Sequence, residues 1–444
     1  MQYLYETIFY SEKVNQVFSN ASTIGLMLRF ESALAAAQAR HGIIPEKSAT
    51  IIKRNCKLEK INPEQLIEEA GLSGNLNIPL VKQLTSIIKK ENEEAAKYVH
   101  FGATSQDVID TALMMQLRDA TKMIAGDLNQ LIRQLIFLTK EHRNTIMAGR
   151  SFMQQARPIS FGFKAAGWLD PLLRSKQAMQ VLLKEVFVLQ LGGAVGTLSS
   201  MGKKGLQVSE TMGAALKLNV PAKSWHAQRD RLALIASVMG ILTENIGKIG
   251  KDISLMAQTE IGELKEPYKK GKGGSSAMPH KQNPVGCISI LSNAARVPAL
   301  VSIIFSSMVQ DHERATGLWH AEWQTMADIM QLTAGTVVKA VEVTDGLRVN
   351  RKQMLINLEI TKGLIYAENI SMALAPLIGK AEAHELVEQL SRESQSKNKH
   401  LKEICIHDPI ISNHLKKSQI EKCFDPALST GICNAFIDMV LKSS

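Results

Sequence analysis

One stretch of the sequence, residues 270–284, holds the side chains best suited to chemistry. Its first half, Lys270–Ser276, contains only glycine, lysine and serine, so it has no apolar face to bury and is predicted to be a mobile loop. In the second half, two prolines bracket His280, Lys281 and Asn283, which gives a stiff segment rich in hydrogen-bond donors. A mobile arm joined to such a segment is typical of a lid that closes over an anion and brings a serine with it.

The stretch lacks the patterns of two common kinds of site. No Gly-x-Ser-x-Gly elbow surrounds Ser275 or Ser276, which disfavours a hydrolase. No Gly-x-x-x-x-Gly-Lys-Ser/Thr run is present, which disfavours a nucleotide phosphate loop. Taken alone, the stretch is most simply interpreted as a solvated surface loop.

Long segments of helical periodicity must position this loop. Apolar residues at spacings of three and four extend from Leu113 to Leu138, which predicts one helix of more than 25 residues. Helices this long cannot be covered by one small domain, so they predict a helix bundle shared between subunits. Similar long patterns cover roughly 159–191, 228–264, 285–310 and 322–346.

Shorter helices are predicted before the bundle. Residues 26–38 have helical spacing. Several short helices are expected in the segment that follows, broken at Pro63, Gly71, Gly74 and Pro79.

No segment alternates polar and apolar residues with comparable strength, so the predicted fold class is all-α. We expect three helical domains, with a long central helix bundle shared in an oligomer. Their predicted ranges are 1–108 for the N-terminal domain, 109–350 for the central bundle and 351–444 for a C-terminal domain without visible chemistry.

Composition and charge narrow the class of protein. The 444 residues are 45% hydrophobic and only 5% aromatic, which favours helices over sheets. The net charge of +10 raises nucleic acid as a partner, but the lysines are dispersed among acids and no recognition pattern accompanies them. A basic protein that binds a small polyanion explains the charge equally well, and we expect no nucleic-acid partner.

The sequence also predicts where the protein works. No basic segment followed by an apolar run opens the chain, so no signal peptide is expected. No stretch approaches roughly 18 uninterrupted apolar residues, so no membrane span is expected. The five cysteines lack paired spacing, which indicates reduced thiols in the cytoplasm and argues against structural zinc.

A second chemical motif is His-Phe-Gly-Ala-Thr-Ser-Gln-Asp at 100–107. Thr104 or Ser105 can cap the helix that follows, and capping alone would explain them. The start of a helix with free N–H groups and two hydroxyls is also suited to binding a carboxylate. A lone histidine such as His100 is more often structural than catalytic.

Three stretches together resemble the signature regions of the fumarase/aspartase superfamily. They are Gly-Ser-Ser-x-Met-Pro-x-Lys-x-Asn at 274–283, His-x-Gly-x-Thr-Ser-x-Asp at 100–107 and Gly-Arg-Ser-x-x-Gln-x-Ala-x-Pro at 149–158. The resemblance spans nearly the whole chain and is specific in each motif. It implies an enzyme that adds or removes a group beside a carboxylate-bearing carbon, through an aci-carboxylate intermediate. It also implies a homotetramer with each site built from loops of three subunits, and no metal or organic cofactor.

Phe152 departs from that family pattern. Fumarase, argininosuccinate lyase and adenylosuccinate lyase carry a catalytic histidine at the corresponding position. An amine or hydroxide leaving group needs a proton as its bond breaks, whereas a carboxylate does not, because a carboxylic acid ionises near pH 4. One branch of the superfamily has a carboxylate leaving group, namely the cycloisomerases that lactonise 3-carboxy-cis,cis-muconate in aromatic catabolism. The run Glu-Arg-Ala-x-Gly-x-Trp-x-x-Glu-Trp at 313–323 also resembles that branch.

The resemblance to this family implies a role for each matched residue. Ser275, six residues before Lys281, corresponds to the catalytic serine that moves the proton, and the N–H groups of Gly273, Gly274 and Ser276 would stabilise its alkoxide. Lys281 and Asn283 would hold the carboxylate that becomes the aci-form, with His100 also in the site. Other carboxylates of a polycarboxylate substrate would be bound by Thr104, Ser105, Ser151, Gln154, Ser276, Met278 and Arg314.

Two alternatives stay open at this point. An adenylosuccinate-type amine lyase would need another histidine, such as His100, as its acid. A non-catalytic scaffold on the same fold would bind carboxylates without turnover.

Overall fold

The structure is a computed structural model that describes residues 4–444. Contacts separate the chain into two compact units, each made of three segments. Unit 1 comprises the described part of Met1–Leu128 with Ser175–Gly247 and Ser289–Val338. Unit 2 comprises Asn129–Arg174, Lys248–Ile288 and Lys339–Ser444. The predicted three-domain division, with boundaries at 108 and 350, stays a prediction.

The N-terminal part of unit 1 consists of short helices around α3, whose N-cap Ser19 accepts the N–H of Ser22. The predicted break at Gly74 is observed as a left-handed residue that ends α5, and Pro63 begins that helix. The predicted breaks at Gly71 and Pro79 are wrong. Gly71 lies inside α5, and Pro79 lies in the first turn of α6, where a missing N–H breaks no helical bond. The helices are α1 (Glu6–Phe9), α2 (Glu12–Val17), α3 (Asn20–Arg40), α4 (Glu46–Asn55), α5 (Pro63–Ser73), α6 (Asn77–Glu91) and α7 (Glu93–Ala96).

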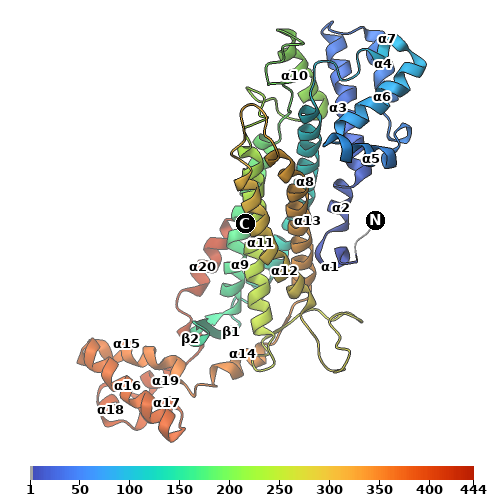
Figure 1. Cartoon of the computed structure of the whole chain (residues 1–444). Helices are drawn as coiled ribbons and strands as arrows, with labels where there is room; N and C mark the ends of the chain where they lie inside the picture. Colours follow the sequence, from blue (N-terminus) through green and yellow to red (C-terminus); the bar gives the residue numbers. More distant parts are fainter. Residues whose placement is uncertain (1–3) are drawn as a thin grey trace. The chain divides into compact units, whose positions relative to one another are not determined.

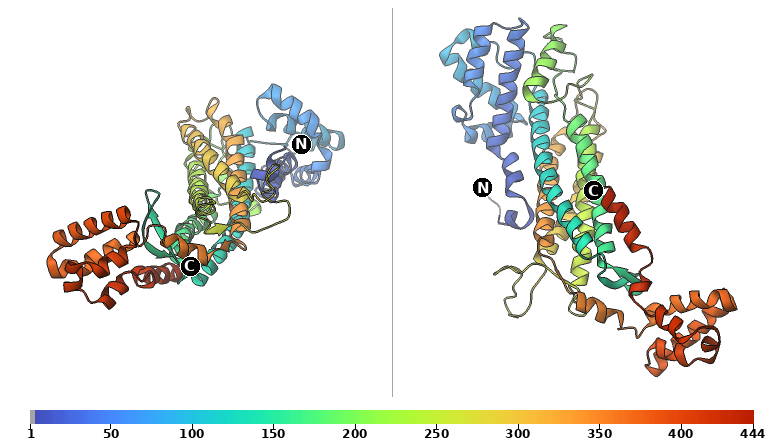
Figure 2. Two further views of the ribbon diagram at one scale, coloured as in Figure 1. Left: turned by 90° about the horizontal axis from the view of Figure 1, so that it is seen from below. Right: turned by 180° about the vertical axis from the view of Figure 1, so that it is seen from behind.

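Five long helices supply the bundle. Within unit 1, their segments run side by side, as Figures 1 and 2 both show for α8, α11, α12 and α13. The predicted apolar face of α8 is buried, with Leu117, Ile124 and Leu131 all 0% exposed. The helices are α8 (Ser105–Glu141), α9 (Phe161–Val181), α11 (Asp230–Met256), α12 (Val285–Ser306) and α13 (Leu318–Thr344).

Two of these helices are shorter than predicted. After α9 the chain forms a π-helical turn over Leu182–Val186 and then an extended segment in which Val188 bridges Asn219. After α11 the chain turns through the exposed residues 258–260 and then enters strand β3 (Leu264–Lys265), which pairs with β4 (Arg348–Val349). The apolar pattern continues past α9 because residues 187–191 are buried as well. The connecting α10 spans Lys204–Leu216.

A β-hairpin was missed by the sequence interpretation. Strands β1 (Ile146–Ser151) and β2 (Gln154–Ser160) pair antiparallel in unit 2, with a register shift between Ala148 and Arg150. Polar and apolar residues do not alternate regularly along these strands. The fold is nevertheless dominated by helices, which confirms the predicted all-α class.

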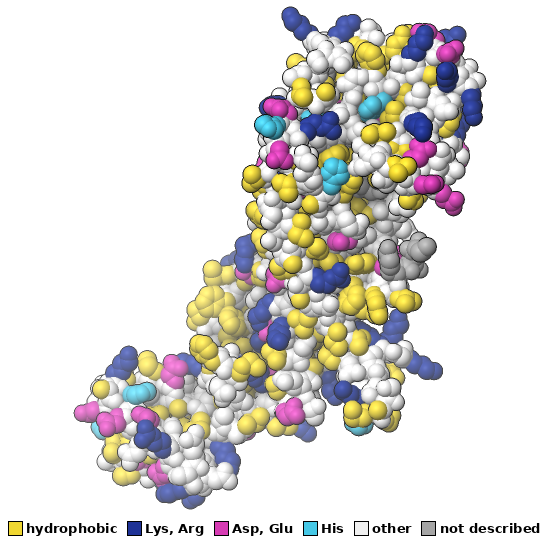
Figure 3. Space-filling model, viewed as in Figure 1, with side chains coloured by type: hydrophobic (Ala, Val, Ile, Leu, Met, Phe, Trp, Pro, Cys, Tyr) yellow, Lys and Arg dark blue, Asp and Glu magenta, His cyan; other side chains and the backbone are white. Residues whose placement is uncertain are grey.

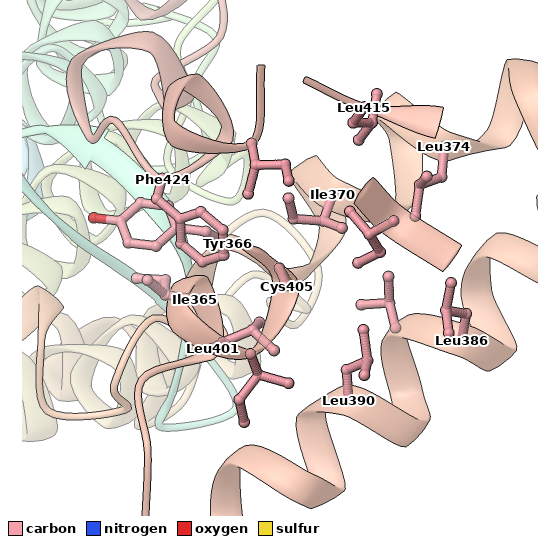
Figure 4. Close-up of a cluster of buried hydrophobic side chains, with 14 of the residues drawn as sticks. Ile365, Tyr366, Ile370, Leu374, Leu386, Leu390, Leu401, Cys405, Leu415 and Phe424 are labelled. Carbon is pink, nitrogen blue, oxygen red and sulfur yellow. The ribbon is translucent and has the colours of Figure 1, made fainter. Parts of the chain in front are cut away.

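The C-terminal part of unit 2 has its own apolar core (Figure 4). Ile370, Leu374 and Leu401 are 0% exposed there. Tyr366 packs edge-on against Phe424, with ring centroids 5.7 Å apart. The helices are α14 (Arg351–Leu358), α15 (Ala367–Ile378), α16 (Lys380–Lys397), α17 (Leu401–His407), α18 (Pro409–His414), α19 (Lys417–Cys423) and α20 (Cys433–Lys442).

Within residues 4–444, two helices, α11 and α12, are long and apolar enough to cross a membrane by length and composition alone. In the apolar window of α11, 67% of residues are buried, as expected for the core helix of a folded domain, compared with 33% for α12. Ile288, Ile303 and Phe305 of α12 are between 41% and 52% exposed. Figure 3 shows apolar side chains at the surface along the long helices.

Candidate active site

The first turn of α8 is organised around the carboxylate of Asp107, which is fully buried. Its Oδ2 accepts the backbone N–H of Thr104 at 3.0 Å and that of Gly193 at 2.9 Å. Its Oδ1 accepts the N–H of Gly192 at 2.9 Å and lies 2.7 Å from Nε2 of His226. A negative charge at a helix N-terminus is further stabilised by the helix dipole. The carboxylate therefore joins three segments and fixes the start of α8.

Close packing at this point requires glycine. A Cβ on Gly192 would lie 2.7 Å from Cβ of Ser224 and 2.9 Å from Cε1 of His226. Its neighbour Gly193 has φ +70°, a conformation that L side chains rarely adopt. The Gly-Gly pair thus allows two backbone N–H groups to reach one carboxylate.

Arg314, on the loop between α12 and α13, reaches the same helix start. Its Nη1 donates to Oγ1 of Thr104 at 2.7 Å, and its Nε donates to Oε1 of Gln106 at 3.2 Å. Two of the predicted carboxylate-binding residues, Thr104 and Arg314, are therefore in direct contact. Ser105 follows as the first residue of α8.

Beneath this contact lies a buried ion cluster in which two carboxylates share one guanidinium. Arg229 donates to both oxygens of Asp110, at 2.8 and 3.0 Å, and to Glu322, at 2.5 to 3.0 Å. Trp319 donates its indole N–H to Asp110 at 2.9 Å. The side chains of the three charged residues are at most 1% exposed.

Burial and charge shift the pKa values in this cluster. Burial raises the pKa of Glu322 to about 7, although the adjacent Arg229 favours the ionised form, and the nearby Asp110 raises it further. Burial acts to lower the pKa of Arg229, but the two carboxylates outweigh it and raise that pKa. Glu322 is therefore a buried carboxyl that accepts a proton more readily than an exposed glutamate does.

His100 is held in unit 1 by a buried glutamate. Its Nδ1 lies 2.6 Å from Oε1 of Glu31, and its backbone φ is +58°. Burial acts to lower the pKa of His100, but the charge and hydrogen bond of Glu31 raise it overall. The ring is thus oriented and kept basic, which is compatible with the predicted place of His100 in the site.

The hairpin in unit 2 carries two predicted substrate-binding residues, Ser151 and Gln154, at its tip. Ser151 pairs with Gln154 as the last rung of the ladder, and Phe152 and Met153 form the two-residue turn, with φ values of 49° and 66°. Such turns normally contain glycine or asparagine, so two bulky residues here are strained. Phe152 is also 98% exposed.

An ion pair with a buried glutamate anchors the hairpin one residue before the last rung at its tip. Arg150 donates to both carboxylate oxygens of Glu263, at 2.6 and 2.9 Å, and Asn357 donates to the same glutamate at 2.8 Å. The strained, exposed turn is therefore anchored by the residue that precedes its last rung.

The serine loop connects α11 and α12 and is visible in Figure 1. The Ser275 hydroxyl oxygen accepts the backbone N–H groups of Ala277 at 3.3 Å and Met278 at 3.1 Å. These are different donors from the predicted N–H groups of Gly273, Gly274 and Ser276. Both observed donors follow Ser275 in the sequence, at the start of the proline-containing half of the loop. Serines at turns often make such bonds, so they also order the loop.

Hydrogen bonds and an ion pair join the two ends of the serine loop. Glu266 accepts the N–H of Gly286 at 3.2 Å and of Cys287 at 2.8 Å, and it pairs with Lys272 at 3.1 Å. Asn283 donates its N–H to the carbonyl of Gly273 at 2.8 Å.

Close packing explains the glycine at this closure. A Cβ on Gly273 would lie 2.3 Å from the Asn283 oxygen. The predicted Lys281 lies at the exposed surface of the loop, and Asn283 is partly buried.

The predicted site residues fall into two sets. His100, Thr104, Ser105 and Arg314 belong to unit 1. The other set belongs to unit 2 and comprises Ser151, Gln154, Ser275, Ser276, Met278, Lys281 and Asn283.

Sequence reasoning did not assign roles to Gln106, Asp110, Arg229 and Glu322. The sequence does hold a sign of their importance. These polar residues lie on long, largely apolar helices or at their starts, in stretches that match the family. Among the residues that the structure describes, no group of three or more histidine, cysteine or acidic side chains is placed to hold a metal ion.

Comparison with known proteins identifies the class. Residues 7–299 match the family model described as lyase, and residues 363–440 match that of the adenylosuccinate lyase C-terminus. The chain therefore belongs to the lyase family, within the fumarase/aspartase superfamily, as the sequence motifs predicted.

The similarities within that family are specific. The chain is 44% identical to a 3-carboxy-cis,cis-muconate cycloisomerase of Acinetobacter baylyi, covering 100% of this chain and 99% of that protein. It is also 44% identical to the cycloisomerase of the same name from Bradyrhizobium diazoefficiens, covering 95% and 94%. The crystal structure of β-carboxy-cis,cis-muconate cycloisomerase from Acinetobacter calcoaceticus superposes with a TM-score of 0.94 at 42% identity, covering all of both chains. The predicted likeness to the cycloisomerase branch is thus confirmed.

Proposed function

We propose that this chain is a cycloisomerase that converts 3-carboxy-cis,cis-muconate into a carboxymuconolactone. The observation that carries the proposal is Phe152, an apolar residue where related amine and hydroxide lyases hold an acid. A reaction in which a carboxylate forms or breaks the bond needs no acid for that group. The full-length similarity to cycloisomerases supports the same reaction.

In the proposed reaction, one carboxylate oxygen of the substrate adds to a double bond, and a C–O bond forms. The π electron pair moves onto the neighbouring carbon and is delocalised into its carboxylate as the aci-form. That carbon then takes the proton of Ser275, and the alkoxide regains a proton from solvent. The lactonisation therefore consumes one proton overall.

Ser275 needs help to move a proton, because an isolated hydroxyl ionises about as reluctantly as water, whose pKa is about 15.7. The N–H groups of Ala277 and Met278 already point at its oxygen and would stabilise the alkoxide. Lys281 and Asn283 would hold the carboxylate that becomes the aci-form, because its charge increases there.

The remaining polar residues would bind the other carboxylates. The pair of Arg314 and Thr104 supplies a charged and a neutral donor at the start of α8. Ser105, Ser151, Gln154, Ser276 and Met278 would complete the pocket, and His100 would stand beside it as a further donor.

We further propose that the sites form in a homotetramer, with loops from three chains at each site. The exposed apolar face of α12 supports association, because such faces on helices are normally covered. The strained Phe152–Met153 turn supports insertion into a neighbouring chain, because strain of this kind persists where it serves a site. We favour further copies of the chain over lipid or nucleic acid as the partner.

We place the enzyme in the cytoplasm, since all five cysteines are free thiols.

The proposal is tested by following the loss of diene absorbance when the purified protein is mixed with 3-carboxy-cis,cis-muconate. Adenylosuccinate is assayed in parallel. We expect loss of the diene and no cleavage of adenylosuccinate. Cleavage of adenylosuccinate alone would show an amine lyase, and tight tricarboxylate binding without turnover would show a scaffold.

A further inference from the structure

Gln106 is a buried side chain, 1% exposed, that connects Arg314 to the ion cluster below it. Its Oε1 accepts the hydrogen bond from Nε of Arg314 at 3.2 Å. Its Nε2 donates to Oδ2 of Asp110 at 3.2 Å and to the backbone carbonyl of His226 at 2.9 Å. The three groups that hydrogen-bond to this amide are a guanidinium, a carboxylate and a backbone carbonyl.

The amide is oriented by these partners. A carbonyl oxygen can only accept, and an NH₂ group donates, so only one of the two amide orientations satisfies all three contacts. In that orientation the negative end of the amide dipole faces the guanidinium of Arg314 and the positive end faces the carboxylate of Asp110. Inside a protein such dipole–charge contacts are stronger than in water.

The consequence for Arg314 is a fixed orientation. An arginine on a loop has many rotamers, and ordering them opposes binding. Here the guanidinium is held at two points, by Gln106 at Nε and by Thr104 at Nη1. The cluster below Gln106 has two carboxylates for one guanidinium, and this excess negative charge also favours a second cation nearby.

We propose that Gln106 is a positioning residue that holds the Arg314 guanidinium ready to receive a substrate carboxylate. This inference rests on the proposed function, because Arg314 is assigned to substrate binding only there. Gln106 acts through Arg314 and does not itself touch the substrate.

The test measures binding of tricarballylate, a saturated tricarboxylate that cannot form the lactone, by calorimetry with the full-length protein. We expect Gln106→Met to weaken binding by about tenfold, the effect of losing one hydrogen bond to a charged group. In the lactonisation assay the same variant should raise KM by a similar factor and change kcat less. Adding Gln106→Met to Arg314→Ala should cause little further loss, because both act through one contact.

Gln116 provides a matched control on the same helix. It is 4% exposed, and its Nε2 donates to the carbonyl of Val17 at 2.8 Å and to Oγ1 of Thr23 at 2.9 Å. Gln116→Met removes comparable buried bonds away from Arg314 and should leave the tricarballylate affinity unchanged.

The inference would be overturned by wild-type affinity in Gln106→Met, by an equal loss in Gln116→Met, or by additive losses with Arg314→Ala. Absence of tricarballylate binding by the wild type would overturn it too. If Gln106→Met does not fold, Gln106→Asn keeps an amide but withdraws it by one methylene and should show the same weakening. Failure of the wild type to lactonise the muconate would reject the proposed function alone, because the binding measurements judge Gln106 separately.

Discussion

The start of α8 and the serine loop are both proposed to contact the substrate, yet they are built in opposite ways. At the helix start, Asp107 and the cluster around Arg229 are buried, and each carboxylate is held by hydrogen-bond donors. In the loop, Ser276, Met278 and Lys281 are exposed, and the ordering bonds are mostly local. The difference supports our proposal that the carboxylate-binding region is preorganised, whereas the proton-transferring loop closes over the bound substrate.

The largest expected effect concerns the loop. Ser275→Ala should lower kcat by about 10²–10⁴-fold, because it removes the proposed proton donor. Its melting temperature should stay close to that of the wild type, because substitutions in exposed loops rarely change stability. Steady-state kinetics and thermal unfolding measure the two quantities.

Ser276→Ala is the matched control for this change. It removes a neighbouring hydroxyl that is proposed to bind and not to move the proton, so its loss of kcat should be much smaller. Equal losses in the two variants would contradict the assignment of Ser275.

The second prediction tests whether the two regions come from different chains in one site. Ser275→Ala and Arg314→Ala should each be nearly inactive alone. When the two variants are unfolded and refolded together in equal amounts, about a quarter of the wild-type activity should return. In a random tetramer, each site has about one chance in four of taking an intact Ser275 from one chain and an intact Arg314 from another. If the mixed tetramers recover no activity, Ser275 and Arg314 of each site come from the same chain, and the proposal of sites shared between chains is rejected.

The third prediction concerns the stability of the buried region. Arg229→Met should lower the free energy of unfolding by about 3–5 kcal/mol, because it leaves Asp110 and Glu322 buried without their counter-ion. Arg392→Met is the control, since Arg392 forms an exposed pair with Glu388 on α16 and should matter by less than about 0.5 kcal/mol. Urea unfolding gives both values, and similar losses would contradict the role assigned to the cluster.

The smallest expected effect is a pH dependence of the same cluster. A carboxyl with a raised folded-state pKa binds more protons in the folded than in the unfolded protein, so its stabilising contribution is lost as pH rises. For Glu322 this loss should extend from about pH 4.5, the ordinary value, to about pH 7. Relative to Glu322→Gln, the free energy of unfolding of the wild type should therefore fall over this interval. Parallel pH curves for the two proteins would contradict the raised pKa.

Much of the fold could be predicted because helical periodicity is strong over long segments. The apolar spacing from Leu113 to Leu138 gave α8 correctly, and the motifs gave the family. The β1–β2 hairpin could not be predicted, since Arg150, Gln154 and Gln155 give it a polar pattern and its turn holds Phe152 and Met153 where glycine is usual. Phenylalanine and methionine do not indicate left-handed backbone geometry, so the sequence of this turn gives no sign of it.

The motifs named candidate site residues, whose roles stay predictions, but they did not reveal the contacts that support them. Motif positions named Thr104 and Arg314, which the structure brings into contact. Gln106 and Glu322 were passed over, because a polar residue on an apolar helix shows its partner only when the chain is folded. The observed donors to Ser275, Ala277 and Met278, were not named for a similar reason, since spacing along the loop does not reveal in which direction it turns.

The central claim is that Ser275 delivers a proton to carbon during lactonisation, and that the carboxylate which forms the C–O bond needs no acid or base of its own. It is tested most directly by nuclear magnetic resonance of the reaction in D₂O, with 3-carboxy-cis,cis-muconate as substrate. We predict a carboxymuconolactone carrying one deuterium on the carbon beside the carboxylate, formed by the wild type and formed at least about 10²-fold more slowly by Ser275→Ala. Unchanged muconate with the wild-type protein, or equal deuterium incorporation with Ser275→Ala, would contradict the account.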